Sequence, residues 1–473
     1  MLKLAWISPL TRTHHLRSAA FSRMILPLVC DEAEVEVFVD DAEWALLCRE
    51  QHPATARFPV FHFLRLAQRH RTKHFDCFVY QLEDTPACAF VERAMKLFPG
   101  LCCFHDLNLN RLYYSKFAHS TAATDINELM DAEFGPGSVR LGDYHVRGWS
   151  TAAFDAIYPC GRRELQEAGA VAVFNHSARR RVQEDVPHVP VCLCRTPVQS
   201  IARSESERLR REFRDALGSA ANEKLIGFYA SDELSGDAAG LLEEFARLYQ
   251  EHHQQLRLVW GVPSFAQASF AEKVRDKLLG ADSLVSSAIS VAVLDCSSKF
   301  NSYFASLDLF VELRCDALRG IPQGVLAAMA CAIPALVPDA GPCADIPEPC
   351  VLHFPAGLAQ QITLKRLLRE VLQNEALGEE MSQCARLFVR NEGDFRLCAE
   401  ELLSFVRLQA DSLKQRVQER ELELEQAKQR LVAELRHDLM ARNMVLDPSG
   451  SGFDIWPLTG EHAVRDFFGD LEL

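Results

Sequence analysis

Short runs of β-branched and aromatic residues alternate with longer helical patterns from the first residue to about residue 355. Parallel strands are joined by crossover connections, usually helices, so this alternation predicts parallel sheets covered by helices. The expected strands form two sets, one for each sheet. The first set comprises residues 3–8, 35–39, 77–80, 101–104, 171–174 and 189–193; the second comprises residues 225–229, 256–260, 291–294, 309–313, 334–337 and 351–354.

The chain is long enough for two domains, because 473 residues of which 48% are apolar can build two cores of ordinary size. A charged stretch at residues 203–214 has helical composition and few core positions, which indicates a solvated helix face next to a boundary. We therefore expect two Rossmann-like, doubly wound α/β domains facing a central cleft, at residues 1–198 and 199–400.

Beyond residue 400 the apolar residues change to the spacing of a helix seam. They recur at intervals of three and four and are interrupted by Arg420: Leu403, Val406, Ala410, Leu413, Val417, Leu424, Ala427 and Leu431. This predicts a long helix over residues 401–442, which either lies wholly on its own chain or extends as a coiled coil to a second copy or a partner protein. Residues 443–473 are acidic with a Ser-Gly hinge, and we expect a weakly ordered tail or a docking peptide.

Composition excludes several classes of function. The formal net charge of −14 disfavours general nucleic-acid binding. The amino-terminal apolar stretch is broken by Pro9 and has the pattern of a first strand rather than a signal peptide, and no stretch reaches the roughly 18 apolar residues of a membrane helix. We expect a cytoplasmic protein without a transmembrane segment. The 16 cysteines form no CxxC pair, so we expect reduced thiols and no metal site.

Three segments of the second half follow one another in a recognisable order: residues 307–314 (LDLFVELR), 319–330 (RGIPQGVLAAMA) and 333–341 (IPALVPDAG). They resemble the donor-site region of retaining glycosyltransferases of family 4, which have the GT-B fold. In that family an Asp near the start of a strand precedes a Gly-rich turn, a helix and a further strand. Residues 75–82, 98–109 and 170–177 look like the matching segments of the first domain.

The resemblance implies transfer of a sugar from a nucleotide-sugar donor to a glycan or glycoconjugate acceptor, as in polysaccharide biosynthesis, with retention of configuration. It implies that His105 borders the transferred sugar and that Asp106 holds nearby polar groups, although a His after a strand is, taken alone, more often structural. Gly320 and Gly324 would bring backbone N–H groups and a helix N-terminus to the diphosphate. The nucleotide sugar is a co-substrate, and neither a cofactor nor a metal is expected.

The sequence also departs from the family at three places. Two Glu of the donor turn are replaced by Arg319 and Ala327. The loop after the first strand has no Gly and carries instead Arg12, His14 and Arg17, which either grip a phosphate or are solvated. The stretch at residues 229–237, where the family has an Arg and a Lys for the diphosphate, is acidic; we assign its Ser231 to the donor site and expect Arg314 and Arg319 to substitute for the missing cations.

Two functions remain open at this stage. One is an active glycosyltransferase; the other is a GT-B protein without turnover that serves as a partner or scaffold subunit of a glycosylation system, held through the C-terminal helix. A nicotinamide-dependent oxidoreductase would need a GxGxxG motif after a strand, and the sequence has none.

Overall fold

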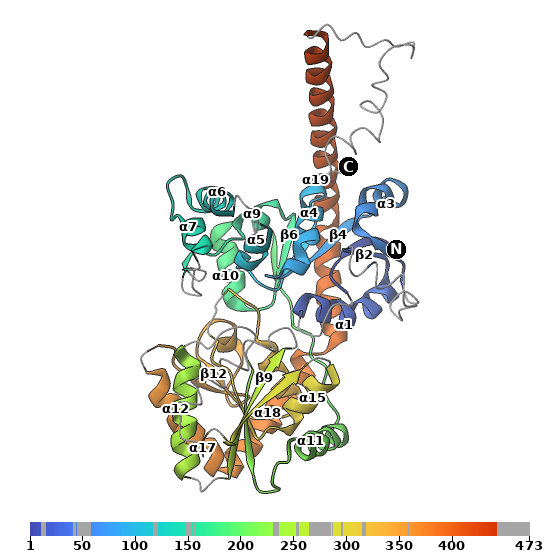
Figure 1. Ribbon diagram of the computed structural model, residues 1–473. Coiled ribbons are helices and arrows are strands. Elements are labelled where there is room, and N and C mark those ends of the chain that lie inside the picture. Colours follow the sequence, from blue (N-terminus) through green and yellow to red (C-terminus); the bar gives the residue numbers. More distant parts are fainter. Residues whose placement is uncertain are drawn as a thin grey trace.

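The computed structural model describes residues 1–10, 16–40, 44, 58–116, 122–147, 149, 154, 157–229, 236–251, 255–263, 285, 287–294, 297–314, 318–357 and 359–441. It shows two α/β bodies, one above the other in Figure 1, and a long helix that runs along the upper body and continues beyond it.

The first sheet, in the upper body, contains seven described strands, all parallel, in the order β3-β2-β1-β4-β5-β6-β7. Every strand expected for the first set is present, and the short edge strand β3 is additional. The bounds are β1 Leu2–Ile7, β2 Ala33–Val39, β3 Val60–His62, β4 Cys77–Leu82, β5 Leu101–Phe104, β6 Ala170–Val173 and β7 Val191–Leu193.

The second sheet contains six described strands, also parallel, in the order β10-β9-β8-β11-β12-β13. It confirms the second set of expected strands. The bounds are β8 Lys224–Tyr229, β9 Leu256–Pro263, β10 Ile289–Leu294, β11 Leu309–Val311, β12 Ala335–Pro338 and β13 Leu352–Phe354.

Helices connect the strands and cover both sheets. In the first domain they are α1 Arg17–Glu32, α3 Leu66–Lys73, α4 Ala89–Leu97, α5 Asn110–Lys116, α6 Ala122–Phe134, α7 Leu141–Val146, α9 Arg162–Glu167 and α10 His176–Asp185, with 3₁₀ turns η2 Phe63–Arg65 and η3 Pro86–Cys88. In the second domain they are α11 Arg203–Leu217, α12 Gly236–Glu251, α15 Ser297–Ser306, α16 Gln323–Ala330, α17 Gln360–Gln373 and α18 Glu375–Glu392, with the 3₁₀ turn η5 Gly341–Asp345. The last helix is α19 Phe395–Ala441.

One face of the first sheet is covered by α1 together with the first part of α19. Leu402, Leu403 and Val406 of α19 are at most 1% exposed and belong to the same apolar cluster as Trp6 and Ile25. The approach is close, because a Cβ at Gly169 beside β6 would collide with the Leu413 side chain. The C-terminal helix therefore begins at Phe395 rather than at residue 401, and its first half is part of the core of the first domain.

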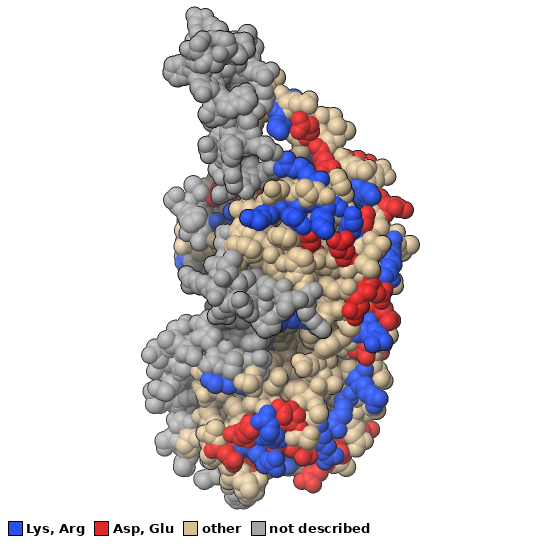
Figure 2. Space-filling view, turned by 90° about the vertical axis from the view of Figure 1, so that its right-hand side faces the viewer, with Lys and Arg blue, Asp and Glu red and all other residues tan. Residues whose placement is uncertain are grey.

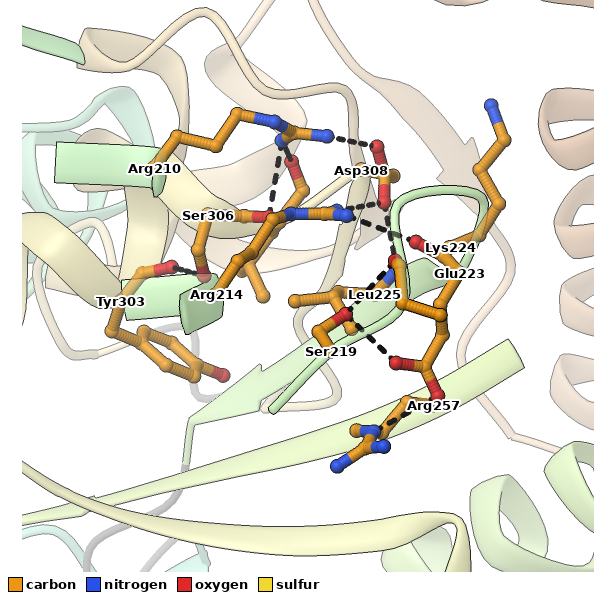
Figure 3. A network of polar contacts seen from close by, with 12 residues as sticks. Arg210, Arg214, Ser219, Glu223, Lys224, Leu225, Arg257, Tyr303, Ser306 and Asp308 are labelled. Atoms are coloured by element: carbon orange, nitrogen blue, oxygen red, sulfur yellow. Dashed lines mark hydrogen bonds and ion pairs between the residues drawn. The ribbon is translucent and has the colours of Figure 1, made fainter. Parts of the chain in front are cut away.

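Helix α11 combines a solvated face and a face that anchors the second sheet. Outward-facing Arg208 pairs with Glu205 and Glu212 along the helix, and Figure 2 shows acidic and basic side chains mixed over the lower body. On the inner side, Arg210 and Arg214 converge on Asp308 at 2.6 and 2.5 Å (Figure 3). Asp308 also accepts the Leu225 N–H at 2.7 Å, so this family-like Asp ties the first residues of β8 and β11 to α11.

Replacing Leu402 by Ala should destabilise the protein although the residue follows the whole second domain. The lost methyl groups leave a cavity against the first sheet, which costs about 2–5 kcal/mol at a buried leucine. Leu408, on the same helix but 76% exposed, is the matched control, and its replacement by Ala should change the free energy of unfolding by less than about 0.5 kcal/mol. Denaturant unfolding followed by circular dichroism measures both, and equal effects would contradict the placement of α19 in the core.

Candidate functional site

The two domains meet through a short backbone pairing at the carboxyl ends of β5 and β11. Asp106 and Arg319 form an antiparallel bridge. The Leu107 N–H donates to the Leu318 carbonyl at 2.7 Å, and the Gly320 N–H donates to the His105 carbonyl at 2.9 Å. Because ligands of open α/β sheets bind at this edge, the connection after β5 and the expected donor turn lie where a ligand between the domains would bind.

Histidine 105 lies in an aromatic environment and is only 5% exposed. Its ring stacks on Phe174 at a centroid distance of 4.7 Å and meets Phe21 edge-on at 5.4 Å. Its Nε2 is 2.9 Å from the Gln81 side-chain oxygen, to which a protonated Nε2 donates. Burial, and secondarily the charge of Arg17, lower the pKa of His105 well below the usual value, so the imidazole is neutral.

Asp106 is 2% exposed and is held from two sides. It forms an ion pair with Arg17, the first residue of α1, and accepts the Asp84 N–H at 3.1 Å. Arg17 also donates to the Gly320 carbonyl at 3.1 Å and lies 3.5 Å from a Glu83 carboxylate oxygen. The guanidinium of Arg17 therefore links acidic residues of the first domain to the backbone of the expected donor turn.

Arg319 is paired with an acid of the opposite domain. Its Nη2 lies 3.2 Å from Oδ2 of Asp84, whose other carboxylate oxygen accepts the Leu112 N–H at 3.0 Å. The Arg319 carbonyl accepts the Asn175 side chain at 3.4 Å. We call Arg17, Glu83, Asp84, Asp106 and Arg319 the interdomain charge cluster.

The cluster has three carboxyl groups for two guanidinium groups, and all three carboxyl residues are at most 6% exposed. Burial raises the pKa of Asp84 to about 7 although Arg319 lowers it, and burial also raises the pKa of Glu83 above the usual value. An uncompensated buried carboxylate is costly, so retention of a proton within the cluster restores the charge balance.

The two glycines of the predicted donor site are each required by a close contact, and the two contacts differ. A Cβ at Gly320 would lie 2.8 Å from the His105 carbonyl oxygen and 3.2 Å from Arg17, so glycine permits the contact between domains. A Cβ at Gly324 would lie 2.7 Å from the Phe310 ring, so glycine there permits packing of α16 on β11.

Arg314 donates through Nε and Nη2, each at 3.0 Å, to the fully buried Glu312.

Of the residues expected in the site, the structure brings His105, Asp106, Arg17, Arg319 and Gly320 together. Arg314 lies after β11 and Gly324 lies within α16, with the separate contacts given above, and Arg12, His14 and Ser231 lie outside the described residues. Sequence reasoning missed Glu83 and Asp84. The signal was two acidic residues directly after a buried strand, at the sheet edge that binds ligands.

A cavity of about 520 Å³ also lies between the domains, on the side of the linker between β7 and α11. Its lining is mainly apolar and includes Phe174, Ile321 and Phe388, with Arg195 and Glu401 among its polar residues. Neither His105 nor Arg319 lines it. We therefore keep the charge cluster and the donor turn, rather than this cavity, as the candidate site.

The part of the chain that the structure describes contains neither a cluster of metal ligands nor a membrane-spanning helix. No three His, Cys, Asp or Glu side chains within it are grouped as metal ligands. None of the helices described there combines the length and the apolar character needed to cross a membrane.

Two facing parallel sheets and a final helix that returns to the first domain define the GT-B fold of glycosyltransferases. The chain is similar to the structure of Alr3699/HepE from Anabaena in complex with UDP, with a TM-score of 0.57 and 12% identity over 86% of this chain and 100% of that one. It is also similar to sucrose-phosphate synthase from Thermosynechococcus elongatus (TM-score 0.56, 13% identity, 86% and 99% covered).

A further similar structure is that of WaaG, a glycosyltransferase involved in lipopolysaccharide biosynthesis (TM-score 0.52, 14% identity, 85% and 99% covered). No protein-family model matches the sequence, and no curated protein matches it. At such low identity these likenesses establish the fold.

Replacing Asp84 by Asn should change how stability depends on pH. A carboxyl group whose native pKa is raised binds its proton more tightly in the folded than in the unfolded state, so folding loses stability as the pH rises from about 4 to about 7. The free energy of unfolding of the wild type should fall relative to that of the Asp84→Asn variant across this window, by up to roughly 4 kcal/mol.

Denaturant unfolding at a series of pH values measures this difference. Asp185→Asn, which removes an ion pair to Arg181 within α10, is the control and should show a nearly constant difference from the wild type. A constant difference for Asp84→Asn as well would show that the buried carboxyl group does not titrate in this range.

Proposed function

We propose that the protein is a glycosyltransferase that moves a sugar from a nucleotide-sugar donor, bound by the second domain, to a glycan or glycoconjugate acceptor on the first. The observation that carries this proposal is the position of the donor turn: Arg319 and Gly320 precede α16 and lie against the carboxyl edge of the opposite sheet. The GT-B fold supports it, as do similar structures described as complexes with UDP and UDP-glucose.

The chemistry of the turn suits an anionic ligand. Helix α16 begins at Gln323, after Pro322, and its first N–H groups and positive dipole end favour a diphosphate. Arg319 would supply the charge that stabilises the leaving group. Transfer with retention of configuration, and a phosphate-binding part for Arg12, His14 and Arg17, remain predictions from the family resemblance.

Donor binding of this kind requires a rearrangement. The Gly320 N–H is bonded to the His105 carbonyl and the Arg319 guanidinium to Asp84, so both groups must leave their protein partners before they can bind a diphosphate. We therefore propose that the described arrangement is a closed state without donor, and that residues 105–107 and 318–320 separate when the donor enters.

The same contacts favour a second candidate, a GT-B protein without turnover that serves as a subunit of a glycosylation system. The carboxylates of Asp84 and Asp106 bind the two arginines that would otherwise bind phosphate. The Glu residues of the family's donor turn are absent, since Arg319 and Ala327 stand in their places. In this case the charge cluster fixes the two domains permanently. A cytoplasmic location fits both candidates and stays a prediction.

Isothermal titration of the full chain with UDP, GDP and their sugars tests the transferase. We expect binding of one nucleotide family, and Arg319→Ala should weaken it roughly ten- to a hundredfold, since hydrogen bonds to a charged group contribute about 1.5–3 kcal/mol. Asp84→Asn should strengthen it, because Arg319 is released. Arg208→Ala, which changes an exposed arginine of α11, should leave it unchanged.

Two outcomes would contradict parts of this proposal. If folded protein binds none of these nucleotides at millimolar concentration, the transferase is wrong and the subunit without turnover remains. If a nucleotide binds but Arg319→Ala and Arg208→Ala bind it equally well, Arg319 is not the phosphate ligand.

A further inference from the structure

Helix α19 leaves its own domain well before it ends. Val417, 5% exposed, is the last buried side chain described on it. The final contacts to the first domain are the Arg420–Glu167 pair at 3.7 Å and the Glu421–His70 pair at 3.6 Å. From there to Ala441 the helix stands clear of the upper body (Figure 1), over a length of about 30 Å.

This projecting segment has little to stabilise it within one chain. Most of the stability of helices in proteins comes from packing of an amphipathic face rather than from intrinsic helix propensity. Its described ion pairs, Arg420–Glu423 at 3.6 Å and Glu425–Lys428 at 3.9 Å, join partly or largely exposed side chains and contribute a few tenths of a kcal/mol each. Leu422 is 60% exposed. A second helix alongside would supply the missing stabilisation.

The sequence of the segment has an apolar stripe and a separation of charge. Leucine or alanine recurs every three or four residues, at positions 424, 427, 431, 435 and 439. Residues 419–425 contain four glutamates and one arginine. Residues 428–442 contain four basic and two acidic residues. The first part of the segment is therefore negative and the last part positive.

We propose that the projecting part of α19 pairs with the same segment of a second copy of this chain, in antiparallel orientation, about a two-fold axis at Leu431. This axis sets position 427 opposite position 435 of the second copy on either side of the Leu431 pair, so apolar residues meet at the centre of the seam. It sets Lys428 opposite Glu434 of the second copy, so two pairs of opposite charges flank the axis, and it sets the acidic start of each helix opposite residues 437–443, in which one acidic and one basic residue balance.

The length of the projecting segment fits this axis. Position 421, where α19 leaves its own domain, lies opposite position 441, the last residue of the helix. The overlap therefore uses the whole free segment. A parallel, in-register pair would instead place the two acidic starts side by side, where like charges repel.

Sedimentation velocity of the full chain over a roughly hundredfold range of concentration tests the proposal, since association follows mass action. We expect a monomer of 53.2 kDa to give way to a dimer as the concentration rises. Leu431→Asp should abolish the dimer, because it brings two carboxylates together at the axis. Leu422→Asp, at an exposed position off the stripe, should leave it intact.

Orientation is tested by charge exchange. Lys428→Glu or Glu434→Lys alone should weaken the dimer, since each places like charges opposite one another, and the double variant should restore it. The substituted positions 422, 428, 431 and 434 all lie on the projecting segment, outside the two domains. Circular dichroism should therefore show that every variant is folded. A chain that stays monomeric, or a dimer that survives Leu431→Asp, overturns the proposal. If the double variant dimerises as weakly as the single variants, the antiparallel pairing is wrong.

Discussion

A parallel sheet needs cover on both faces, and in this protein one cover of the first sheet comes from beyond the second domain. The buried leucines of α19 complete a core begun by β1 and α1. The chain consequently crosses between the domains twice, and the two crossings are tied together: Arg195 in the outgoing linker binds Glu392 and Glu401, and the Val198 N–H donates to the Gly393 carbonyl at 3.1 Å. Any relative motion of the domains must bend both crossings at this place.

The two tied crossings hold the carboxyl edges of the two sheets against each other. Side chains that are remote in the sequence therefore meet there. Arg17 reaches Gly320, and Arg319 reaches Asp84. Beside the backbone pairing, the Arg319–Asp84 ion pair joins the two domains through charges. If the proposed function holds, this ion pair is one of the contacts that a bound diphosphate would replace.

Much of the fold could be predicted from the sequence, because buried parallel strands appear as apolar runs, and every expected strand is present. The edge strand β3 was missed because three residues, Val60–His62, carry too little pattern. The expected donor turn was located from its motif. The pairing of its Arg319 with Asp84 could not be predicted, since the two residues lie 235 positions apart and only the packing of two domains joins them. The charged helix α11 was predicted as a solvated face. Composition does not reveal that Arg210 and Arg214 point inward and bind Asp308.

The return of α19 also affects how the chain is made. A ribosome releases the first domain long before the helix that completes its core, so that during synthesis the first sheet has one apolar face without its final cover. The second domain, from α11 to α18, is contiguous and can reach its full set of contacts as soon as it emerges. Domains generally fold in the order of synthesis. Here the order of completion is reversed, because the second domain can be complete before the first.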